Sequence, residues 1–234
     1  AELYSEHITK QEFKMNSEKQ YSLKKILTIW AAIAIPMPIL AFIIAPALYP
    51  YFNIHNGIIF WICMIVGMAW QTIVSIYVLY NELGTLKWSV VKERIWLNKP
   101  FNYKTEKSSN KYFWWLIPGL LYVGLIVAFI STPIENFTAK LLPFLAKLPV
   151  MEIGELATEE FIGAWWIVGI ALISSIFNYF IGEELLFRGV LLPKMNGVFG
   201  KYDWVVNNLL FALYHLHKPV HIIAFMIDGL SMTF

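Results

Sequence analysis

Cysteine is almost absent from the sequence, since Cys63 is its single representative. One thiol has no partner within the chain, so an intrachain disulfide framework is excluded, and Cys63 is predicted to be a small hydrophobe inside an apolar run. An excess of charge of one sign is missing too, because 18 basic residues oppose 16 acidic ones. Nothing therefore favours a nucleic-acid partner. No cleavable signal peptide is evident, because the first apolar run is too long for the hydrophobic core of such a peptide.

Apolar residues, in contrast, are abundant. Hydrophobic residues make up 58% of the chain and aromatic residues 17%, and the mean hydropathy is +0.58. Soluble domains contain about 45–50% apolar residues. Several apolar runs also reach the roughly 20 residues that a helix needs to cross the hydrocarbon core of a bilayer. The sequence therefore predicts an all-α fold, a polytopic integral membrane bundle of helices with the lipid bilayer as its surroundings.

Three regions follow one another along the chain. Residues 1–24 are polar and of mixed charge, and they predict a loosely helical cytoplasmic tail. Residues 25–159 are predicted to hold the N-terminal transmembrane spans, with an amphipathic interfacial helix and a loop over residues 81–111. Residues 160–234 hold the remaining spans and the candidate site. The predicted spans and part-spans are residues 26–47, 58–80, 112–130, 161–181, 202–217 and 220–234.

Prolines interrupt two of the apolar stretches. Pro36, Pro38 and Pro46 fall inside the first span, where they predict a kink. Residues 131–160 contain three more prolines around an apolar stretch too short to span, so a re-entrant or surface-lying segment is expected there. The last apolar run stops at Phe234 before it reaches the length of a span. We therefore expect the sequence to be truncated before its last helices.

Lysine and arginine predict how the helices are oriented. Most of them lie in the N-terminal tail and in residues 81–111, whereas residues 49–56 have none and residues 131–160 have only Lys140 and Lys147. Cytoplasmic loops carry an excess of these residues. The N-terminus and residues 81–111 are therefore predicted to be cytoplasmic, at the inner or plasma membrane if the source is bacterial.

The most informative residues are charged and follow the fourth apolar run: Glu183, Glu184 and Arg188. A charged side chain at the centre of a bilayer costs about 2.5–3.5 kcal/mol on insertion scales, so such residues usually pair and face a functional cavity. On an α-helix Glu184 and Arg188 share one face, while Glu183 points about 100° away. Phe211 and His215 form a second pair, also four residues apart, in a later apolar run. Two carboxylates, an arginine and a histidine at membrane depth predict a catalytic site, in the half of the membrane nearer the cytoplasm.

These two patterns, Glu183-Glu184-Leu-Leu-Phe-Arg188 and Phe211-Ala-Leu-Tyr-His215, are similar to the E-E-x-x-x-R and F-x-x-x-H motifs of the CPBP family. That family comprises CAAX-type and bacteriocin-processing (Abi-type) intramembrane proteases, and the resemblance covers the C-terminal region. It implies a hydrolase that cuts a membrane-associated peptide or protein. The catalytic residues would be Glu183, Glu184 and His215, with Arg188 and Phe211 in support. The family's last motif, a histidine four residues before asparagine or aspartate, is not found, as the expected truncation would explain.

The residue chemistry itself is compatible with peptide hydrolysis. By hypothesis Glu183 is the general base on a water molecule that neutral His215 helps to position. Arg188 would anchor Glu184, which orients the site or assists proton transfer. A zinc (Zn) cofactor stays open, because family members are called metalloproteases. One histidine and one glutamate fall short of the three protein ligands usual at catalytic zinc, and a second glutamate only just reaches that number. The peptide substrate and the oligomeric state are left open.

Other interpretations of the charged residues remain. An ion pair at a helix end explains Glu184 and Arg188 without any catalysis. A non-catalytic membrane scaffold or bacteriocin-immunity protein of the same fold would also keep such residues. A proton- or ion-coupled transporter would use the same buried charges, but it predicts inverted repeats, and we see no such symmetry in the sequence.

Several further polar residues of the C-terminal region are weaker candidates. His217, beside a lysine and a proline, is predicted to be a wet interfacial residue. His221 and Asp228 are seven residues apart and share one helical face, so they are predicted to line a cavity. Asn207 and Asn208 are predicted to bond across helices.

Overall fold

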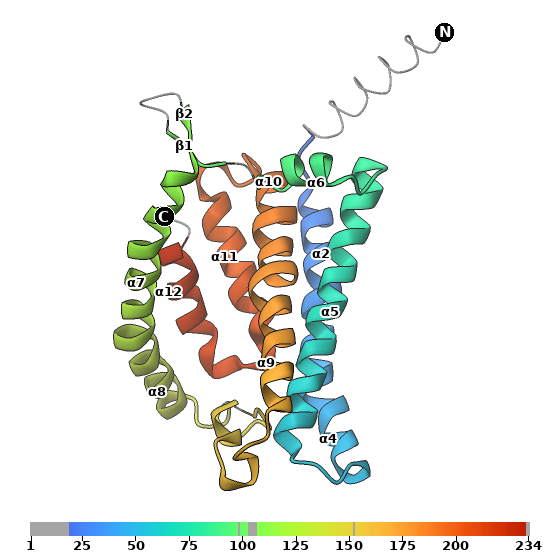
Figure 1. Cartoon of the computed structure of the whole chain (residues 1–234), viewed down its shortest axis with the longest axis vertical. Helices are drawn as coiled ribbons and strands as arrows, with labels where there is room; N and C mark the ends of the chain where they lie inside the picture. Colours follow the sequence, from blue (N-terminus) through green and yellow to red (C-terminus); the bar gives the residue numbers. More distant parts are fainter. Residues whose placement is uncertain (1–18, 98, 103–106, 152, 233–234) are drawn as a thin grey trace.

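The computed structural model of the chain describes residues 19–97, 99–102, 107–151 and 153–232. Among them, the two strands β1 (Phe101–Asn102) and β2 (Lys107–Ser108) form a short antiparallel pair, and the other regular elements are helices. The helices stand side by side as a bundle (Figure 1). Two of them, Leu23–Tyr51 and Asn56–Leu83, are long and apolar enough to cross a membrane. The predicted all-α membrane fold is confirmed, whereas most of the predicted tail lies outside the described residues.

The first long helix runs continuously over five labelled stretches. They are α2 (Leu23–Ala34), α3 (Pro36–Ile39), the π turn η1 (Leu40–Ile44), α4 (Ala45–Leu48) and the 3-10 turn η2 (Tyr49–Tyr51). The Ser22 side chain caps its start by accepting a hydrogen bond from the Lys25 backbone N–H at 3.2 Å. The predicted distortion takes the form of the π turn, which lies between Pro38 and Pro46. Proline cannot donate to the helical ladder, and the wider π pattern occupies the interval between the two.

The second long helix is α5 (Asn56–Leu83), and it contacts both the first helix and the C-terminal helices. The Nδ1 atom of His55 accepts a hydrogen bond from the Gly57 N–H at 3.1 Å and so caps its start. It ends at Gly84, whose φ of 65° lies in the left-handed region that favours glycine. This helix therefore has defined ends and serves as a reference for depth in the bundle.

The short helix α6 (Trp88–Arg94) follows at the end of the bundle where α2 begins (Figure 1). It corresponds to the amphipathic helix predicted within residues 81–111. Its predicted apolar face is only partly buried, because Val91 joins the core while the Trp88 side chain is 62% exposed. An exposed tryptophan at this level suits the membrane–water interface.

A single helical run then extends from Asn110 to Leu141. It consists of the 3-10 turn η3 (Asn110–Trp115), α7 (Leu116–Ile126), the π turn η4 (Val127–Ser131) and α8 (Thr132–Leu141). The prediction of a re-entrant or surface segment from residue 131 onward is wrong for α8, which continues the preceding helix. Pro133 does not stop the helix because it lies in the first turn of α8, where proline is tolerated. The described residues from 142 to 165 form turns and the short 3-10 helices η5 (Ile153–Leu156) and η6 (Glu159–Phe161).

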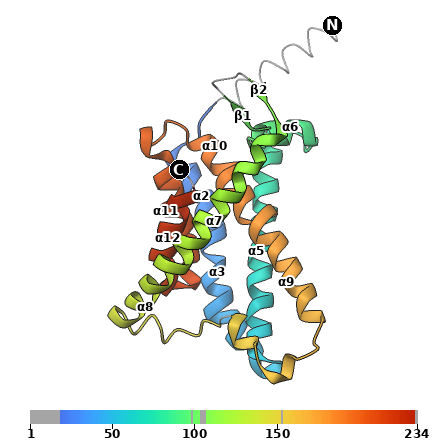
Figure 2. The ribbon, with the colours of Figure 1, turned by 60° about the vertical axis from the view of Figure 1, so that its left-hand side comes forward.

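The C-terminal third consists of helices broken at short turns. Helix α9 (Trp166–Ile176) continues into the π turn η7 (Phe177–Ile181), and after Gly182 the chain becomes helical again at Glu183. The elements that follow are the π stretch η8 (Leu185–Leu191), α10 (Leu192–Met195), η9 (Gly200–Tyr202), α11 (Asp203–Tyr214), η10 (His215–His217), η11 (Pro219–His221) and α12 (Ile222–Met232). Helices α7, α8 and α12 form one side of the bundle, and α5 and α9 form the other (Figures 1 and 2).

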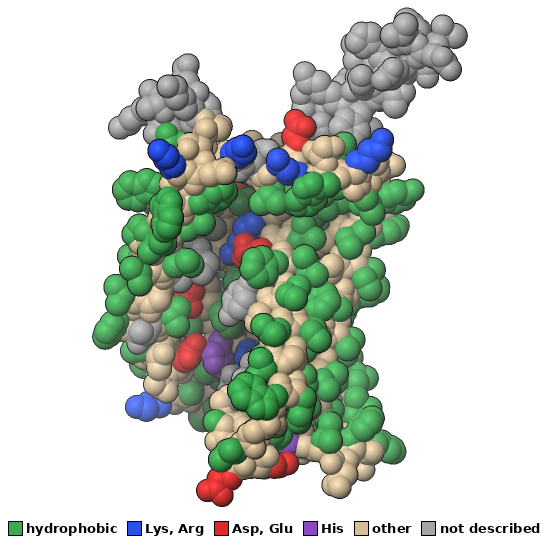
Figure 3. Space-filling view, viewed as in Figure 1, with side chains coloured by type: hydrophobic (Ala, Val, Ile, Leu, Met, Phe, Trp, Pro, Cys, Tyr) green, Lys and Arg blue, Asp and Glu red, His purple; other side chains and the backbone are tan. Residues whose placement is uncertain are grey.

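Large apolar side chains cover the outside of the bundle (Figure 3). Ile43, Tyr77 and Leu120, for example, are each more than half exposed. A surface of this kind is suited to lipid rather than to water. Lysine and arginine gather at the end where α6 and α10 lie (Figure 3). We call this the basic end; its assignment to the cytoplasm stays a prediction.

A buried ion network ties the basic end to the C-terminal helices. Glu82 Oε1 lies 2.7 Å from Arg94 Nε and 3.0 Å from Lys194 Nζ. The Arg94 guanidinium also donates to the backbone carbonyls of Gly189 and Val190, both at 3.1 Å. Because these two carbonyls belong to η8, the network holds the helix that carries the candidate acidic pair against α5 and α6.

Candidate active site

The backbone leaves regular helical geometry at Gly182, where φ and ψ are both −94°, beside the middle of α5. The Thr72 hydroxyl donates to the Ile181 carbonyl at 3.0 Å. A side chain at Gly182 would collide with the Phe177 carbonyl oxygen, so this position requires glycine. At 1.5 Å per residue, Thr72 is about 24 Å along α5 from its first residue and about 17 Å from its last. The acidic pair that begins at Glu183 therefore lies close to mid-depth, slightly toward the basic end.

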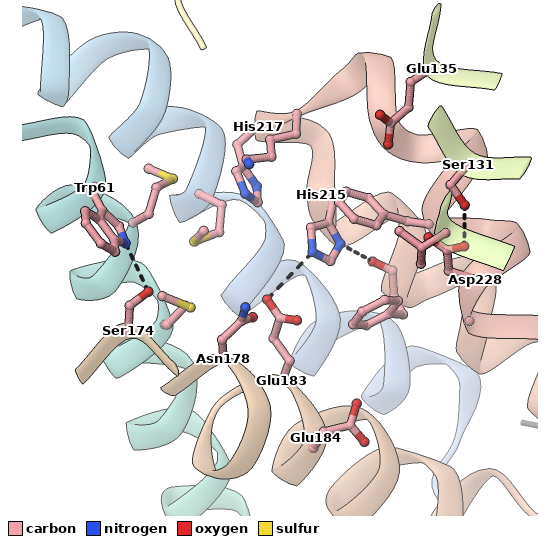
Figure 4. A pocket seen from close by; sticks show the side chains of 18 of the residues that line it. Trp61, Ser131, Glu135, Ser174, Asn178, Glu183, Glu184, His215, His217 and Asp228 are labelled. Atoms are coloured by element: carbon pink, nitrogen blue, oxygen red, sulfur yellow. Dashed lines mark hydrogen bonds and ion pairs between the residues drawn. The ribbon is translucent and has the colours of Figure 1, made fainter. Parts of the chain in front are cut away.

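Glu183 and His215 meet in the interior at this level (Figure 4). Nε2 of His215 lies 3.6 Å from Oε1 of Glu183, and the two side chains are 9% and 12% exposed, respectively. On the other edge of the ring, Nδ1 of His215 lies 2.9 Å from the Phe211 carbonyl oxygen. A carbonyl can only accept, so Nδ1 carries a proton. In the neutral imidazole, Nε2 is then the acceptor that faces Glu183.

Aromatic rings hold the His215 imidazole in this orientation. Its centroid lies 4.1 Å from that of Phe225, 4.9 Å from Phe211 and 5.0 Å from Tyr214. The His217 ring stacks on it at 5.5 Å, with 28° between the planes. The prediction that His217 is a wet interfacial residue is wrong, because this side chain is only 5% exposed. The turn η10 folds His217 back against His215 instead of leading it out of the bundle.

Glu184 and Arg188 form the predicted pair, with Glu184 Oε1 3.7 Å from Arg188 Nη1. The Glu184 side chain is 46% exposed, and it lies farther from His215 than Glu183 does (Figure 4). The guanidinium carbon of Arg188 lies 4.4 Å from the centroid of the Phe211 ring, a cation–π arrangement. Phe211 therefore orients two partners at once, Arg188 through its ring and His215 through its carbonyl.

The five candidate residues line one cavity of about 570 Å³: Glu183, Glu184, Arg188, Phe211 and His215. Its far wall contains a second polar pair, in which the Ser131 hydroxyl donates to Asp228 Oδ1 at 2.5 Å. Asp228 thus lines the cavity as predicted. His221 is not among the described residues that line it, but its Nε2 lies 3.8 Å from Oε2 of the lining residue Glu135. The hollow is visible on the side of the bundle, between the column of α7 and α8 and that of α9 (Figure 3).

Asn207 and Asn208 bond across helices, as the sequence predicted. Nδ2 of Asn207 donates to the Phe187 carbonyl at 2.9 Å, and Nδ2 of Asn208 donates to the Met226 carbonyl at 2.7 Å. Lipid offers no water to hydrogen-bond a polar side chain, so a hydrogen bond to a neighbouring helix takes its place. These two amides therefore fix α11 against η8 and α12, the two elements beside the cavity.

Asn178 is a polar residue of the cavity that the sequence did not predict. When its amide nitrogen faces Glu183, this nitrogen lies 3.1 Å from both carboxylate oxygens, an orientation assigned from the hydrogen bonds that it satisfies. Residues five apart are about 140° apart around an α-helix, so their spacing carries no signal of contact. The π turn η7 and the non-helical backbone of Gly182 bring Asn178 and Glu183 together.

The described residues do not provide a complete zinc site. Within them, no group of three histidine, cysteine, aspartate or glutamate side chains could hold a metal ion. Glu183 and His215 supply two possible ligands, whereas catalytic zinc usually takes three from the protein. This donor set does not fit zinc.

Comparison with protein families adds an independent observation. Residues 161–234 match the model of a family described as type II CAAX prenyl endopeptidase, Rce1-like. The resemblance to the CPBP proteases is confirmed. No curated protein and no solved structure matches the chain. The Rce1-like segment includes Asn178 and the five candidate residues, whereas α5 and the far-wall residue Ser131 lie outside it.

Proposed function

We propose that the protein is an intramembrane endopeptidase that hydrolyses a peptide bond of a membrane-associated peptide or protein. The observation that carries the proposal is the Glu183–His215 pair, which is enclosed at mid-depth and faces a cavity. The Rce1-like match supports a CAAX-type protease. Buried ionisable groups inside a membrane bundle are rare and commonly functional, which also favours an enzyme.

The pair is suited to hold one water molecule. Oε1 of Glu183 and Nε2 of His215 are 3.6 Å apart, so one water at about 2.8 Å from each can bond to both. Ionised Glu183 and neutral His215 both accept hydrogen bonds here, so they take the two hydrogens of this water. Its oxygen lone pairs are then turned toward the cavity, where the peptide carbonyl would lie.

The reaction that follows is a general-base hydrolysis. The water oxygen bonds to the carbonyl carbon while one water proton passes to the Glu183 carboxylate. The C–N bond then breaks, and the proton held by Glu183 passes to the leaving amine. The products are a carboxylic acid and an amine, so atoms and charges balance. Arg188, held by Glu184 and Phe211, adds a positive charge beside the pair, which stabilises the ionised carboxylate before attack.

The substrate class follows from the position of the cavity. The hollow on the side of the bundle is flanked by exposed apolar side chains (Figure 3). A peptide anchored in the bilayer reaches such an opening without leaving the membrane. The description of the matched family names prenylated C-a-a-X proteins, and a tail that carries a lipid has this property. A bacteriocin leader or another membrane-near peptide has it as well.

Cleavage of lipid-anchored peptides by the purified protein in liposomes tests the proposal. The set includes prenylated C-a-a-X peptides and unprenylated peptides with a single apolar anchor. Glu183→Ala and His215→Ala are each expected to lower the rate about 10²–10⁴-fold, because each removes a partner of the water. Glu93→Ala, on the exposed face of α6, is the matched control and is expected to cleave like wild type.

Two outcomes would overturn the proposal. Glu183→Ala cleaving at the wild-type rate would exclude Glu183 as the base. A folded wild-type protein that cleaves none of the peptides would favour the non-catalytic scaffold or immunity role. Chelation decides the zinc question separately, since a loss of rate on chelation that added zinc restores would show that a metal takes part.

A further inference from the structure

We propose that Asn178 is a positioning residue that holds the Glu183 carboxylate in its reactive orientation, an inference that rests on the proposed hydrolysis. In the amide orientation assigned above, its nitrogen lies 3.1 Å from each carboxylate oxygen, so one NH2 group contacts both. Asn178 is neutral, and it therefore orients Glu183 without cancelling its charge. Glu184, in contrast, has a cationic partner in Arg188.

The segment that carries Asn178 is fixed to α5 on both sides of this residue. One turn earlier, the Trp61 indole N–H donates to the Ser174 hydroxyl oxygen at 3.0 Å. Shortly after it, the Thr72 hydroxyl donates to the Ile181 carbonyl at 3.0 Å. Two such anchors on one helix set the rotation of α9 and η7 about their axis. Asn178 consequently points into the cavity beside Glu183 (Figure 4).

The π turn is what aligns the two residues. Asn178 and Glu183 are five apart, and a regular α-helix would place them about 140° apart around the axis. The turn Phe177–Ile181 follows the i→i+5 pattern, in which each turn takes more residues. Residue 183 therefore returns toward the face of residue 178. Such turns are frequent at functional sites, and this one has a specific geometric consequence.

The contact restricts rotation of the Glu183 carboxylate about its terminal torsion, which sets how the carboxylate faces the attacking water. The terminal torsion of a glutamate is broad and roughly two-fold, so an unanchored carboxylate samples many orientations. The amide of Asn178 on one side leaves Oε1 directed at His215, 3.6 Å from Nε2. Glu183 and His215, the two hydrogen-bond acceptors of the water, are then held in position together. A displacement of about 1 Å at a reacting group costs about 100-fold in rate.

Asn178→Ala tests this role in the liposome assay with lipid-anchored peptides. We expect kcat to fall about 100-fold while KM stays near the wild-type value, because the contact acts on the water and not on substrate binding. Asn178→Asp puts a carboxylate beside Glu183 and should lose at least as much. Asn81→Ala, at the exposed end of α5, is the matched control and should leave both constants unchanged.

A double-mutant cycle separates positioning from a merely structural role. If Asn178 acts through Glu183, adding Asn178→Ala to Glu183→Gln should change the residual single-turnover rate by less than about twofold. The same 100-fold loss in both backgrounds would overturn the inference, as would a wild-type kcat for Asn178→Ala. Those two results leave the proposed hydrolysis intact. Wild-type activity of Glu183→Gln would instead overturn the proposed function itself.

Discussion

Glu183 and Glu184 are neighbours in the chain but have different surroundings. Glu183 is enclosed between Asn178 and His215, whereas the Glu184 side chain is 46% exposed beside Arg188. Consecutive residues of a helix point about 100° apart, so one carboxylate enters the cavity and the other lies at its edge. Two carboxylates in unlike environments can take different chemical roles.

Glu184→Gln is expected to lose much less activity than Glu183→Gln. A half-exposed ion pair contributes about 0–1 kcal/mol, so the free energy of unfolding should fall by less than about 1 kcal/mol. Cleavage rates of both variants in liposomes, with thermal unfolding in the same detergent, measure the difference. Equal losses of activity in two folded variants would assign Glu184 a direct part in proton transfer.

At the scale of elements, the π turns have the largest influence on the site. The described residues contain four of them, and η7 and η8 flank Gly182 and Glu183. The first and second predicted spans coincide closely with the helices Leu23–Tyr51 and Asn56–Leu83, because long apolar runs predict a helix whatever its detailed geometry. The change from α to π geometry has no such signal in the sequence. It shifts which residues share a face, and this is why Asn178 was not predicted.

The ion network at the basic end connects elements that are far apart in the chain. Besides its pairs with Arg94 and Lys194, Glu82 accepts a hydrogen bond from the Tyr21 hydroxyl at 2.5 Å. The backbone N–H of Tyr21 donates to the Lys194 carbonyl at 3.0 Å. Burial raises the pKa of the Tyr21 hydroxyl, so this group stays a donor across the physiological range. The network therefore joins the first helix, α5, α6 and α10.

Arg94→Met is expected to destabilise the protein by about 3–5 kcal/mol, the usual cost of removing one partner of a buried ion pair. The variant removes one cationic partner of the buried Glu82 carboxylate, and it removes the donor to two η8 carbonyls. Lys92→Met on the same helix is the control and should unfold like wild type. Thermal unfolding in detergent measures both variants, and equal stability of the two would contradict a supporting role for Arg94.

At the scale of the whole molecule, the cavity is assembled from two parts of the chain. The Rce1-like segment, residues 161–234, supplies the acid pair and the histidine. The helices before it supply Trp61 on α5 and Ser131 at the end of η4, which line the opposite walls (Figure 4). Residues outside the Rce1-like segment therefore help to enclose the site.

The predicted orientation can be measured by thiol labelling, because the chain has a single cysteine. Cys63 is 5% exposed, and Cys63→Ser provides a background without thiols. In that background Lys87→Cys reports on the basic end and Phe52→Cys on the opposite end; both positions are exposed. A membrane-impermeant maleimide added outside intact cells should label position 52 and not 87. The reverse pattern would place the N-terminal side outside the cytoplasm.

The sequence by itself determined the class of protein and the residue types of the site. Apolar runs of span length require helices in lipid, and the pairs Glu184–Arg188 and Phe211–His215 follow from local helical spacing. The tertiary structure alone decided which groups meet at mid-depth. The meeting of Glu183 with His215, the far wall at Ser131 and Asp228, and the burial of His217 depend on how distant helices pack. The contact of Asn178 with Glu183 depends on a π turn, which changes the residues that share a helical face. The spacing of apolar residues in the sequence does not predict such a turn.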